Sequence, residues 1–420
     1  MRLTRLCFAG YRDTQGQAEF VSSQWSIMRL IPHGYIAKAA LVLAGLSAGL
    51  LLAEFGLRLD EKLKHDLELE PDARLGHRVV SRAYGHDANG FRNDAVPAHA
   101  DIVALGDSQT WGVNVARAEA WPQALAKQSG RTVYNMGIGG YGSVQYLTLT
   151  DQAAQLSPEI IVIGLYFGND LYDAYLLAYQ NDTYASLRQS GAADKLLPDT
   201  VKPKAEARWA EMQNFHSNYE RSTSGWGYWL RGHSAIGRLL TRTGLGGADG
   251  DVWYEIGAAW AQANPDQGAA YKDNYSRTVL VPAYRLTGLD LDEVRIVEGL
   301  RLTKDVLRRI KRKTDQEKIK LLVLYIPSKE MVYAEAVQRS QWQLTGDYAK
   351  LTEMETRLAS EITSVCEQEG IEHVSALLPL REAVRQSKQI YPSDMESHPL
   401  AQGYAILAST VNEALTSRGW

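Results

Sequence analysis

A serine in the first third of the chain has surroundings that suit nucleophilic chemistry. Ser108 lies in the segment from Gly106 to Gly112, directly after a short apolar run. Glycine allows a tight strand-to-helix turn, which would place the serine hydroxyl at a helix N-terminus, where backbone N–H groups stabilise negative charge. Because a serine at this point can also be an ordinary helix N-cap, this segment alone does not establish a nucleophile.

A histidine near the C-terminus is the candidate base. His398 lies in the segment from Ser393 to Pro399. A residue before proline favours extended backbone, and Pro399 suits the first turn of a helix, so His398 is expected in a loop at a helix start. From there it could take the Ser108 proton and return it to a leaving alcohol.

Two further loops follow apolar runs and carry hydrogen-bond donors. The loop from Asn135 to Gly142 is rich in glycine, which lets backbone N–H groups approach a substrate oxygen. The segment Gly168-Asn169-Asp170 follows another apolar run and offers an amide that could donate to an oxyanion. Each loop alone resembles an ordinary turn, but their joint order with Ser108 and His398 indicates one catalytic centre.

Short apolar runs alternate with amphipathic stretches through much of the chain. The runs predict strands at 101–105, 132–135, 159–166, 320–326 and 371–375, and helices at 118–128, 145–156, 291–313, 348–368 and 399–416. Continuously apolar strands alternating with helices favour a parallel sheet covered on both faces. In such sheets ligands bind at the carboxyl ends of the strands, where three of the four segments lie.

With these four blocks in place, the chain resembles the SGNH (GDSL-like) hydrolase family. The blocks match Gly-Asp-Ser at Ser108, the glycine loop at Gly140, Gly-x-Asn-Asp at Asn169 without its spacer, and the block of His398. The resemblance covers about residues 101–175 and 318–416. It implies an α/β fold of the three-layer flavodoxin-like type with a roughly five-stranded parallel sheet. It also implies an oxyanion hole formed by the Ser108 and Gly140 backbone N–H groups and the Asn169 side chain.

The chain departs from the family at the acid of the triad. The family places an aspartate two or three residues before the histidine, where this chain has Glu396 and Met395, and Asp394 lies four before. Side chains two apart on an extended chain share a face, which favours Glu396 as the partner of His398. A turn would instead bring Asp394 to the ring, so both carboxylates stay candidates.

A single apolar segment near the N-terminus predicts a membrane anchor over residues 34–55. Its uncharged part is short for a span of roughly 20 residues, but a snorkelling Lys38 brings it into range. Arg29 and Lys38 precede the uncharged part from Ala39 to Ala53, and Glu54, Asp60 and Glu61 follow it. The positive-inside rule therefore predicts a single-pass protein whose remainder lies outside the cytoplasm, on the periplasmic side of an inner membrane. A cleaved signal peptide and a buried helix are the alternatives.

The rest of the chain divides around these features. We expect a 1–33 N-terminal segment with the true start at Met28, and a juxtamembrane linker over 56–100. The hydrolase domain is expected to comprise 101–175 and 291–420, and an inserted, mostly helical cap is expected over 176–290. The insertion is rich in aromatic residues, which could bind sugar rings or form a core: Trp209, Trp226, Trp229, Trp253 and Trp260.

Net charge, cysteine content and the lack of metal motifs limit which kinds of binding partner are expected for this chain. A net charge of −4 gives no electrostatic footprint for nucleic acid, and the only two cysteines, Cys7 and Cys366, are expected on opposite sides of a membrane, without a disulfide. No metal or cofactor motif is found, and histidines such as His77, His86 and His373 are assigned surface or core roles.

The sequence therefore predicts a serine esterase that forms an acyl-enzyme on Ser108. Its substrate would be an acylated small molecule or polysaccharide, with an extracytoplasmic glycan or lipid-like ester as the expected class. The same residues would serve a polysaccharide O-acetyltransferase, in which a sugar hydroxyl replaces water. A catalytically inactive binding module using the same cleft is the third possibility.

Overall fold

The computed structural model describes residues 33–65, 68–83, 85–189, 199–223, 234–236, 252–340, 344 and 346–420. The suggested start at Met28 lies outside these residues, as do Trp226 and Trp229 of the insertion. The chain forms two units, one of residues 1–62 with 234–236, the other of the remainder.

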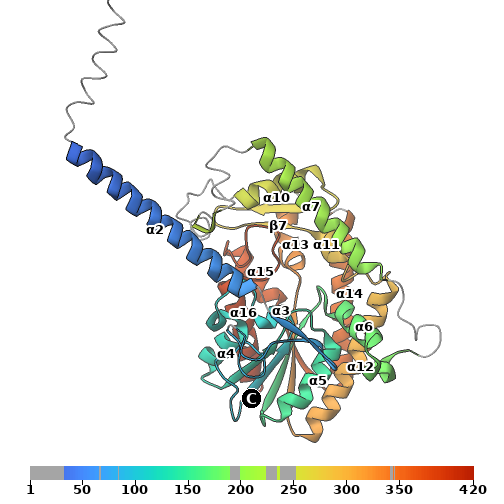
Figure 1. Cartoon of the computed structure of the whole chain (residues 1–420). Coiled ribbons are helices and arrows are strands. Elements are labelled where there is room, and N and C mark those ends of the chain that lie inside the picture. The colour runs from blue at the N-terminus through green and yellow to red at the C-terminus, as the bar shows by residue number, and fades with distance from the viewer. Residues whose placement is uncertain are drawn as a thin grey trace, which may run out of the picture. The chain divides into compact units, whose positions relative to one another are not determined.

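The second unit is built on a parallel sheet (Figure 1). Its order is β4-β3-β5-β8-β9. The strands are β3 (Ile102–Gly106), β4 (Val133–Gly137), β5 (Ile160–Tyr166), β8 (Lys320–Ile326) and β9 (Glu372–Ser375). The predicted five-stranded parallel sheet is confirmed, and β3 and β5 are buried along their whole length, as expected for strands covered on both faces.

Helices cover both faces of the sheet. Val103 and Leu105 of β3 belong to one apolar core, and Ile102 and Ala104 to another, because successive side chains on a strand point to opposite faces. The first core contains residues of α5 (Ser143–Ala154), α6 (Asp170–Gln180), α12 (Val294–Gln316) and α14 (Gly346–Glu369). The second contains residues of α4 (Trp121–Ser129), α13 (Lys329–Arg339), α15 (Leu377–Arg385) and α16 (Ala401–Ser417). The fold is therefore the predicted three-layer α/β type.

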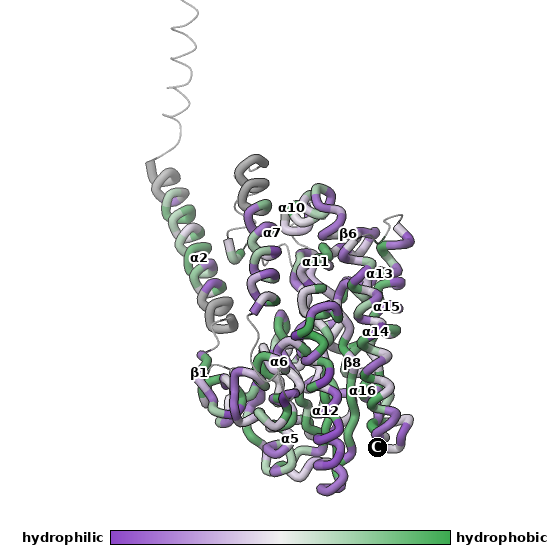
Figure 2. Tube along the Cα trace, turned by 90° about the vertical axis from the view of Figure 1, so that its right-hand side faces the viewer, coloured by the Kyte–Doolittle hydropathy of each residue, from purple (hydrophilic) through white to green (hydrophobic). Residues whose placement is uncertain are grey.

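The first unit contains one long helix, α2 (His33–His65). Its segment Ala40–Arg58 has a mean hydropathy of 2.0 and is not buried by protein, and Figure 2 shows its predominantly hydrophobic colouring. Within the same unit, the backbone N–H groups of Ala235 and Ile236 donate to the Glu54 carboxylate. Length and composition make α2 a candidate membrane span, although apolar helices of this kind also occur as signal sequences and core helices.

The segment predicted as a linker over 56–100 is instead largely part of the second unit. It forms a hairpin of β1 (Leu69–Asp72) and β2 (Gly76–Val79) and then a buried loop. Arg92 in this loop donates to the backbone carbonyls of Trp111 and Gly112. The prediction was wrong because these partners lie about twenty residues away and leave no periodic signal in a polar segment.

Over its described residues the insertion is mostly helical, and they also form a small hairpin. It contains α7 (Val201–Thr223), α10 (Val252–Ala263), β6 (Ala269–Lys272), β7 (Arg277–Leu280) and α11 (Pro282–Leu286). Trp260 is buried in a local core that includes Val279 and Met395, whereas Trp209 stays 41% exposed. The boundary predicted at 176 falls inside α6, whose Tyr179 packs in the main core, so the domain built on the sheet extends past it.

Replacing Arg92 by methionine tests whether this loop belongs to the fold. The substitution leaves the carbonyls of Trp111, Gly112 and Val115 without their donor. We expect the free energy of unfolding to fall by about 2–4 kcal/mol, measured by urea unfolding of the full chain in detergent. Arg78→Met is the control: Arg78 is exposed and paired only with Glu70, so the loss should stay below about 1 kcal/mol. Equal losses of unfolding free energy in the two variants would show that the buried Arg92 contacts contribute no more to stability than an exposed ion pair.

Candidate active site

A row of three glycines makes room for the segment that carries the candidate nucleophile. Gly106, at the end of β3, is in register with Gly137 of β4 and Gly164 of β5. A Cβ at Gly106 or Gly164 would lie 2.0 or 2.6 Å from Thr110 Oγ1, and one at Gly137 would lie 2.8 Å from Thr110 Cβ. The short helix α3 (Ser108–Trp111) therefore packs directly on the strand ends, which only glycine permits.

Ser108 opens α3 and is capped by its neighbour. Asp107 Oδ1 accepts a hydrogen bond of 2.9 Å from Gln109 N, and Asp107 Oδ2 lies 3.2 Å from Ser108 Oγ. His398 Nε2 is closer, 2.8 Å from the same hydroxyl oxygen. Complete burial raises the pKa of Asp107 to about 6, against the hydrogen bond from Gln109 and the positive field of His398. The hydroxyl has one proton, and the shorter distance favours the imidazole as its acceptor.

Glu396 is the carboxylate in contact with the histidine. Its Oε1 lies 2.6 Å from His398 Nδ1 and also accepts the backbone N–H groups of Ser397 and His398. An acceptor on Nδ1 holds the ring proton there and leaves the Nε2 lone pair for Ser108. Burial alone would raise the pKa of Glu396, but the hydrogen bond and charge of His398 outweigh it and lower the value to about 2. The carboxylate is therefore ionised wherever the imidazole can act as a base.

Asp394, the other candidate carboxylate, shapes the loop instead. Its Oδ1 accepts the backbone N–H of Glu396 at 2.9 Å. Its backbone carbonyl accepts a hydrogen bond from Lys329 Nζ at 3.0 Å. The chain thus turns at Asp394 and becomes extended enough afterwards for Glu396 to reach His398.

The two donor loops lie at the ends of the strands that flank β3. Gly140 has a positive φ of 77°, and a Cβ on its neighbour Gly139 would lie 3.7 Å from Ser108 Cβ, so this loop borders the serine. His77 Nε2 of β2 lies 3.0 Å from the Gly139 carbonyl oxygen. Asn169 begins α6, and its Nδ2 donates to Asp173 at 2.5 Å, which leaves its second amide hydrogen for another acceptor.

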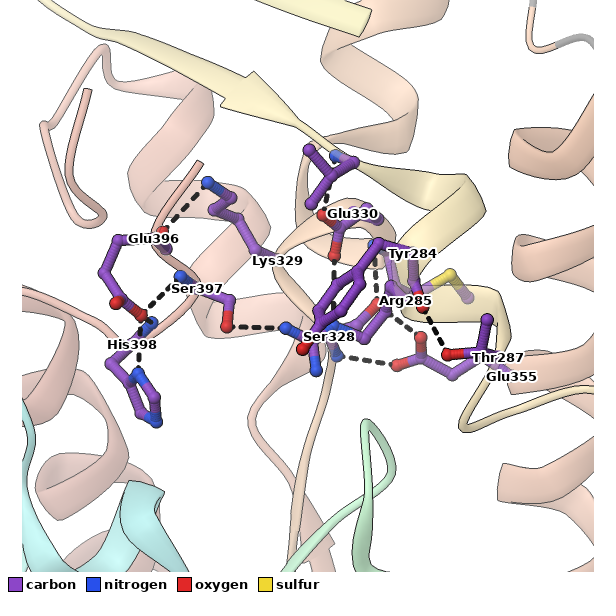
Figure 3. Close-up of polar contacts among 12 residues, drawn as sticks. Tyr284, Arg285, Thr287, Ser328, Lys329, Glu330, Glu355, Glu396, Ser397 and His398 are labelled. Atoms are coloured by element: carbon purple, nitrogen blue, oxygen red, sulfur yellow. Dashed lines mark hydrogen bonds and ion pairs between the residues drawn. The ribbon is translucent and has the colours of Figure 1, made fainter. Parts of the chain in front are cut away.

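Four further residues near the site had no role in the sequence prediction. Asp107 caps Ser108, His77 contacts the glycine loop, Lys329 contacts the histidine loop, and Arg285 Nη2 donates to Ser397 Oγ at 2.6 Å. Figure 3 shows Lys329 and Arg285 on two sides of the segment that leads to His398. The only sequence signal for Lys329 is that a charged pair, Lys329-Glu330, follows an apolar strand after two residues, whereas His77 and Arg285 had none.

The sequence of the sheet region matches a known family. Residues 102–208 match the sequence model of the GDSL-like Lipase/Acylhydrolase family. This part of the chain is a GDSL-like lipase/acylhydrolase domain. The protein is accordingly a serine hydrolase, in line with the Ser108–His398–Glu396 chain of hydrogen bonds.

Solved structures resemble this GDSL-like domain only distantly. A GDSL-like lipase from Bacteroides thetaiotaomicron is 12% identical, with 76% of this chain and 88% of that chain covered and a TM-score of 0.31. Phospholipase A1 from Streptomyces albidoflavus is 10% identical, with 76% and 99% covered and a TM-score of 0.35. Similarity this low has no bearing on substrate. No curated protein sequence matches the chain.

Separate substitutions of the two acidic residues distinguish their contributions. Glu396→Gln removes the charge that stabilises the imidazolium, so kcat for a soluble ester should fall by about 10²–10⁴-fold. Asp394→Asn keeps an acceptor for the Glu396 N–H, so kcat should change by less than about threefold. Initial rates on vinyl acetate measure both. A larger loss in Asp394→Asn than in Glu396→Gln would contradict the assignment from the hydrogen bonds.

Proposed function

We propose that this GDSL-like enzyme is an esterase that removes O-acyl groups, chiefly O-acetyl, from an extracytoplasmic glycan by way of an acyl-enzyme. The observation that carries the proposal is the continuous chain of contacts from Ser108 Oγ through the His398 ring to Glu396, at 2.8 and 2.6 Å. These distances allow proton transfer without rearrangement.

Every proton transfer and bond change in the proposed reaction can be assigned to Ser108, His398, the ester or water. Ser108 Oγ attacks the ester carbonyl carbon while its proton moves to His398 Nε2, and Glu396 stabilises the resulting imidazolium. The C–O bond to the alcohol then breaks, the alcohol takes the proton from Nε2, and the acyl group stays on Ser108. Water, deprotonated by His398, attacks this acyl ester and releases the acid and free Ser108.

The oxyanion formed in each half-reaction needs donors. We assign these to the backbone N–H groups of Ser108 and Gly140 and to the Asn169 amide, because all three follow adjacent strands at one edge of the sheet. The contact to Asp173 would orient the Asn169 amide so that its second hydrogen faces the substrate oxygen. Loss of one such donor typically costs about 10²–10³-fold in rate.

A pair of aromatic residues, the exposed Trp209 and the half-buried Tyr284, supports a sugar-containing substrate. Trp209 of α7 and Tyr284 of α11 lie 5.6 Å apart at a hollow of about 430 Å³ that is also lined by Lys202 and Glu206. Tyr284 directly precedes Arg285, which donates to Ser397 beside the histidine. Aromatic faces with polar groups around them suit the apolar faces and hydroxyls of sugar rings.

The proposed location outside the cytoplasm rests on α2. The span Ala40–Arg58 is long and apolar enough to cross a bilayer. Arg29 and Lys38 lie before the apolar core, and Glu54, Asp60 and Glu61 follow it. By the positive-inside rule, the catalytic unit after the span would face the periplasm.

Covalent labelling and product analysis test the reaction. A fluorophosphonate should label Ser108, with loss of label in His398→Ala and full labelling in Ser81→Ala, an exposed serine control. With an O-acetylated oligosaccharide, we expect acetate in solution. Acetyl transfer to an added oligosaccharide would instead identify an O-acetyltransferase, and an intact protein without label would identify an inactive binding module.

The substrate class is tested at the aromatic pair. Trp209→Ala should raise KM for O-acetylated oligosaccharides by about tenfold, since stacking contributes roughly 1–2 kcal/mol, and leave kcat/KM for vinyl acetate unchanged. Tyr275→Ala is the matched control, because Tyr275 is an 80% exposed aromatic residue in the same insertion. An unchanged KM in Trp209→Ala would remove the support for a glycan.

A further inference from the structure

A completely buried lysine contacts the loop that carries the proposed base (Figure 3). Lys329 is the first residue of α13, directly after the turn that follows β8. Its ammonium lies 2.9 Å from the backbone oxygen of Glu396 and 3.0 Å from that of Asp394. It also lies 2.7 Å from Val279 O and 3.2 Å from Thr278 Oγ1. Its three N–H groups thus all have acceptors.

These contacts join two parts of the chain that are far apart in sequence. Thr278 and Val279 belong to β7 of the insertion, whereas Asp394 and Glu396 belong to the loop of His398. The two segments also meet directly, since Thr278 Oγ1 donates to Pro392 O at 2.7 Å. The inserted hairpin and the histidine loop are therefore held together at one point, and the ammonium of Lys329 lies at that point.

Burial of the charged Lys329 ammonium at this point carries a desolvation cost. Complete burial lowers the pKa of Lys329 to about 8, although Glu330, Asp394 and Glu396 favour its charged form and Arg285 opposes it. These charged groups come from α13, the histidine loop and α11, whereas β7, which also faces the ammonium, offers it the neutral acceptors Val279 O and Thr278 Oγ1. A methionine would fill the same volume without this desolvation cost.

We propose that Lys329 is a positioning residue for the reaction, which acts through the histidine loop and not on the substrate. By holding the backbone carbonyls of Asp394 and Glu396, its ammonium keeps the Glu396 carboxylate against His398 Nδ1 and the ring against Ser108. This role rests on the proposed function of His398 as the base. It also gives the insertion a part in catalysis, since β7 supplies the other acceptors.

The first test replaces Lys329 by methionine in the full chain. The rate of fluorophosphonate labelling at Ser108 and kcat for vinyl acetate should both fall by about 10²-fold, because a misplaced base costs alignment in the transition state. KM should change by less than twofold. Lys313→Met, at the solvent-exposed end of α12, is the matched control and should behave as wild type. A folded Lys329→Met protein labelled within threefold of the wild-type rate would overturn the proposal.

The second test uses the pH profile and does not require the variant to fold. Since the charged form of Lys329 holds the loop, the labelling rate of the wild type should decline above about pH 8, the pKa of this ammonium. Lys329→Met should lack this decline. A wild-type rate that stays level to about pH 10 would overturn the proposal even if the variant does not fold.

A third measurement separates a missing ammonium from a general packing defect. In Lys329→Ala, added ethylammonium should restore labelling at least tenfold, whereas tetramethylammonium, which has no N–H group, should restore nothing; equal effects of the two would contradict the proposal. Labelling that is unaffected by His398→Ala would refute the proposed function itself. Labelling that depends on His398 but not on Lys329 would refute only the positioning role.

Discussion

The parallel register of the central strands is the constraint on which the site depends. Gly106, Gly137 and Gly164 stand level with one another on three neighbouring strands, so their missing side chains create one continuous space. Thr110 fills that space and seats the short helix of Ser108 on the strand ends. A shift of one residue in any strand would bring a side chain into this space. The position of Ser108 is therefore a property of the sheet and not of its loop alone.

Buried cations attach the peripheral segments to this centre. Arg92, from the segment before the sheet, donates to backbone carbonyls at the end of α3 and just after it. Lys329 does the same for the loop before His398. A cation with several N–H groups can satisfy several carbonyls of irregular backbone at once, where no helix or sheet ladder is available to do so. Both segments thus acquire a fixed geometry that their local sequence does not encode.

The predictions of strands and helices succeeded where the local apolar periodicity of the sequence agrees with the tertiary structure. The five strands and the helices that follow them carry their own apolar periodicity, and three of the four loops follow strand ends that a parallel sheet must bring to one edge. They failed over residues 69–100, because Asp87, Arg92 and Asn93 are polar yet buried, and burial of polar residues follows from partners, not from composition. The boundary at 176 was set by the last motif block before the insertion, whereas α6 continues in the main core and the family match extends to residue 208.

By itself, the sequence determined the α/β fold and the family and pointed to Ser108 and His398 as the candidate pair, since strand periodicity and the glycine-rich turns are local properties. Only the tertiary structure decided that Glu396 rather than Asp394 meets the ring, because one backbone turn at Asp394 changes which side chain faces His398. It alone also brought His77 to Gly139 and Lys329 to the histidine loop. These are contacts between residues more than sixty positions apart, and hydrogen bonds of that range depend on where the elements pack and not on any neighbouring residue.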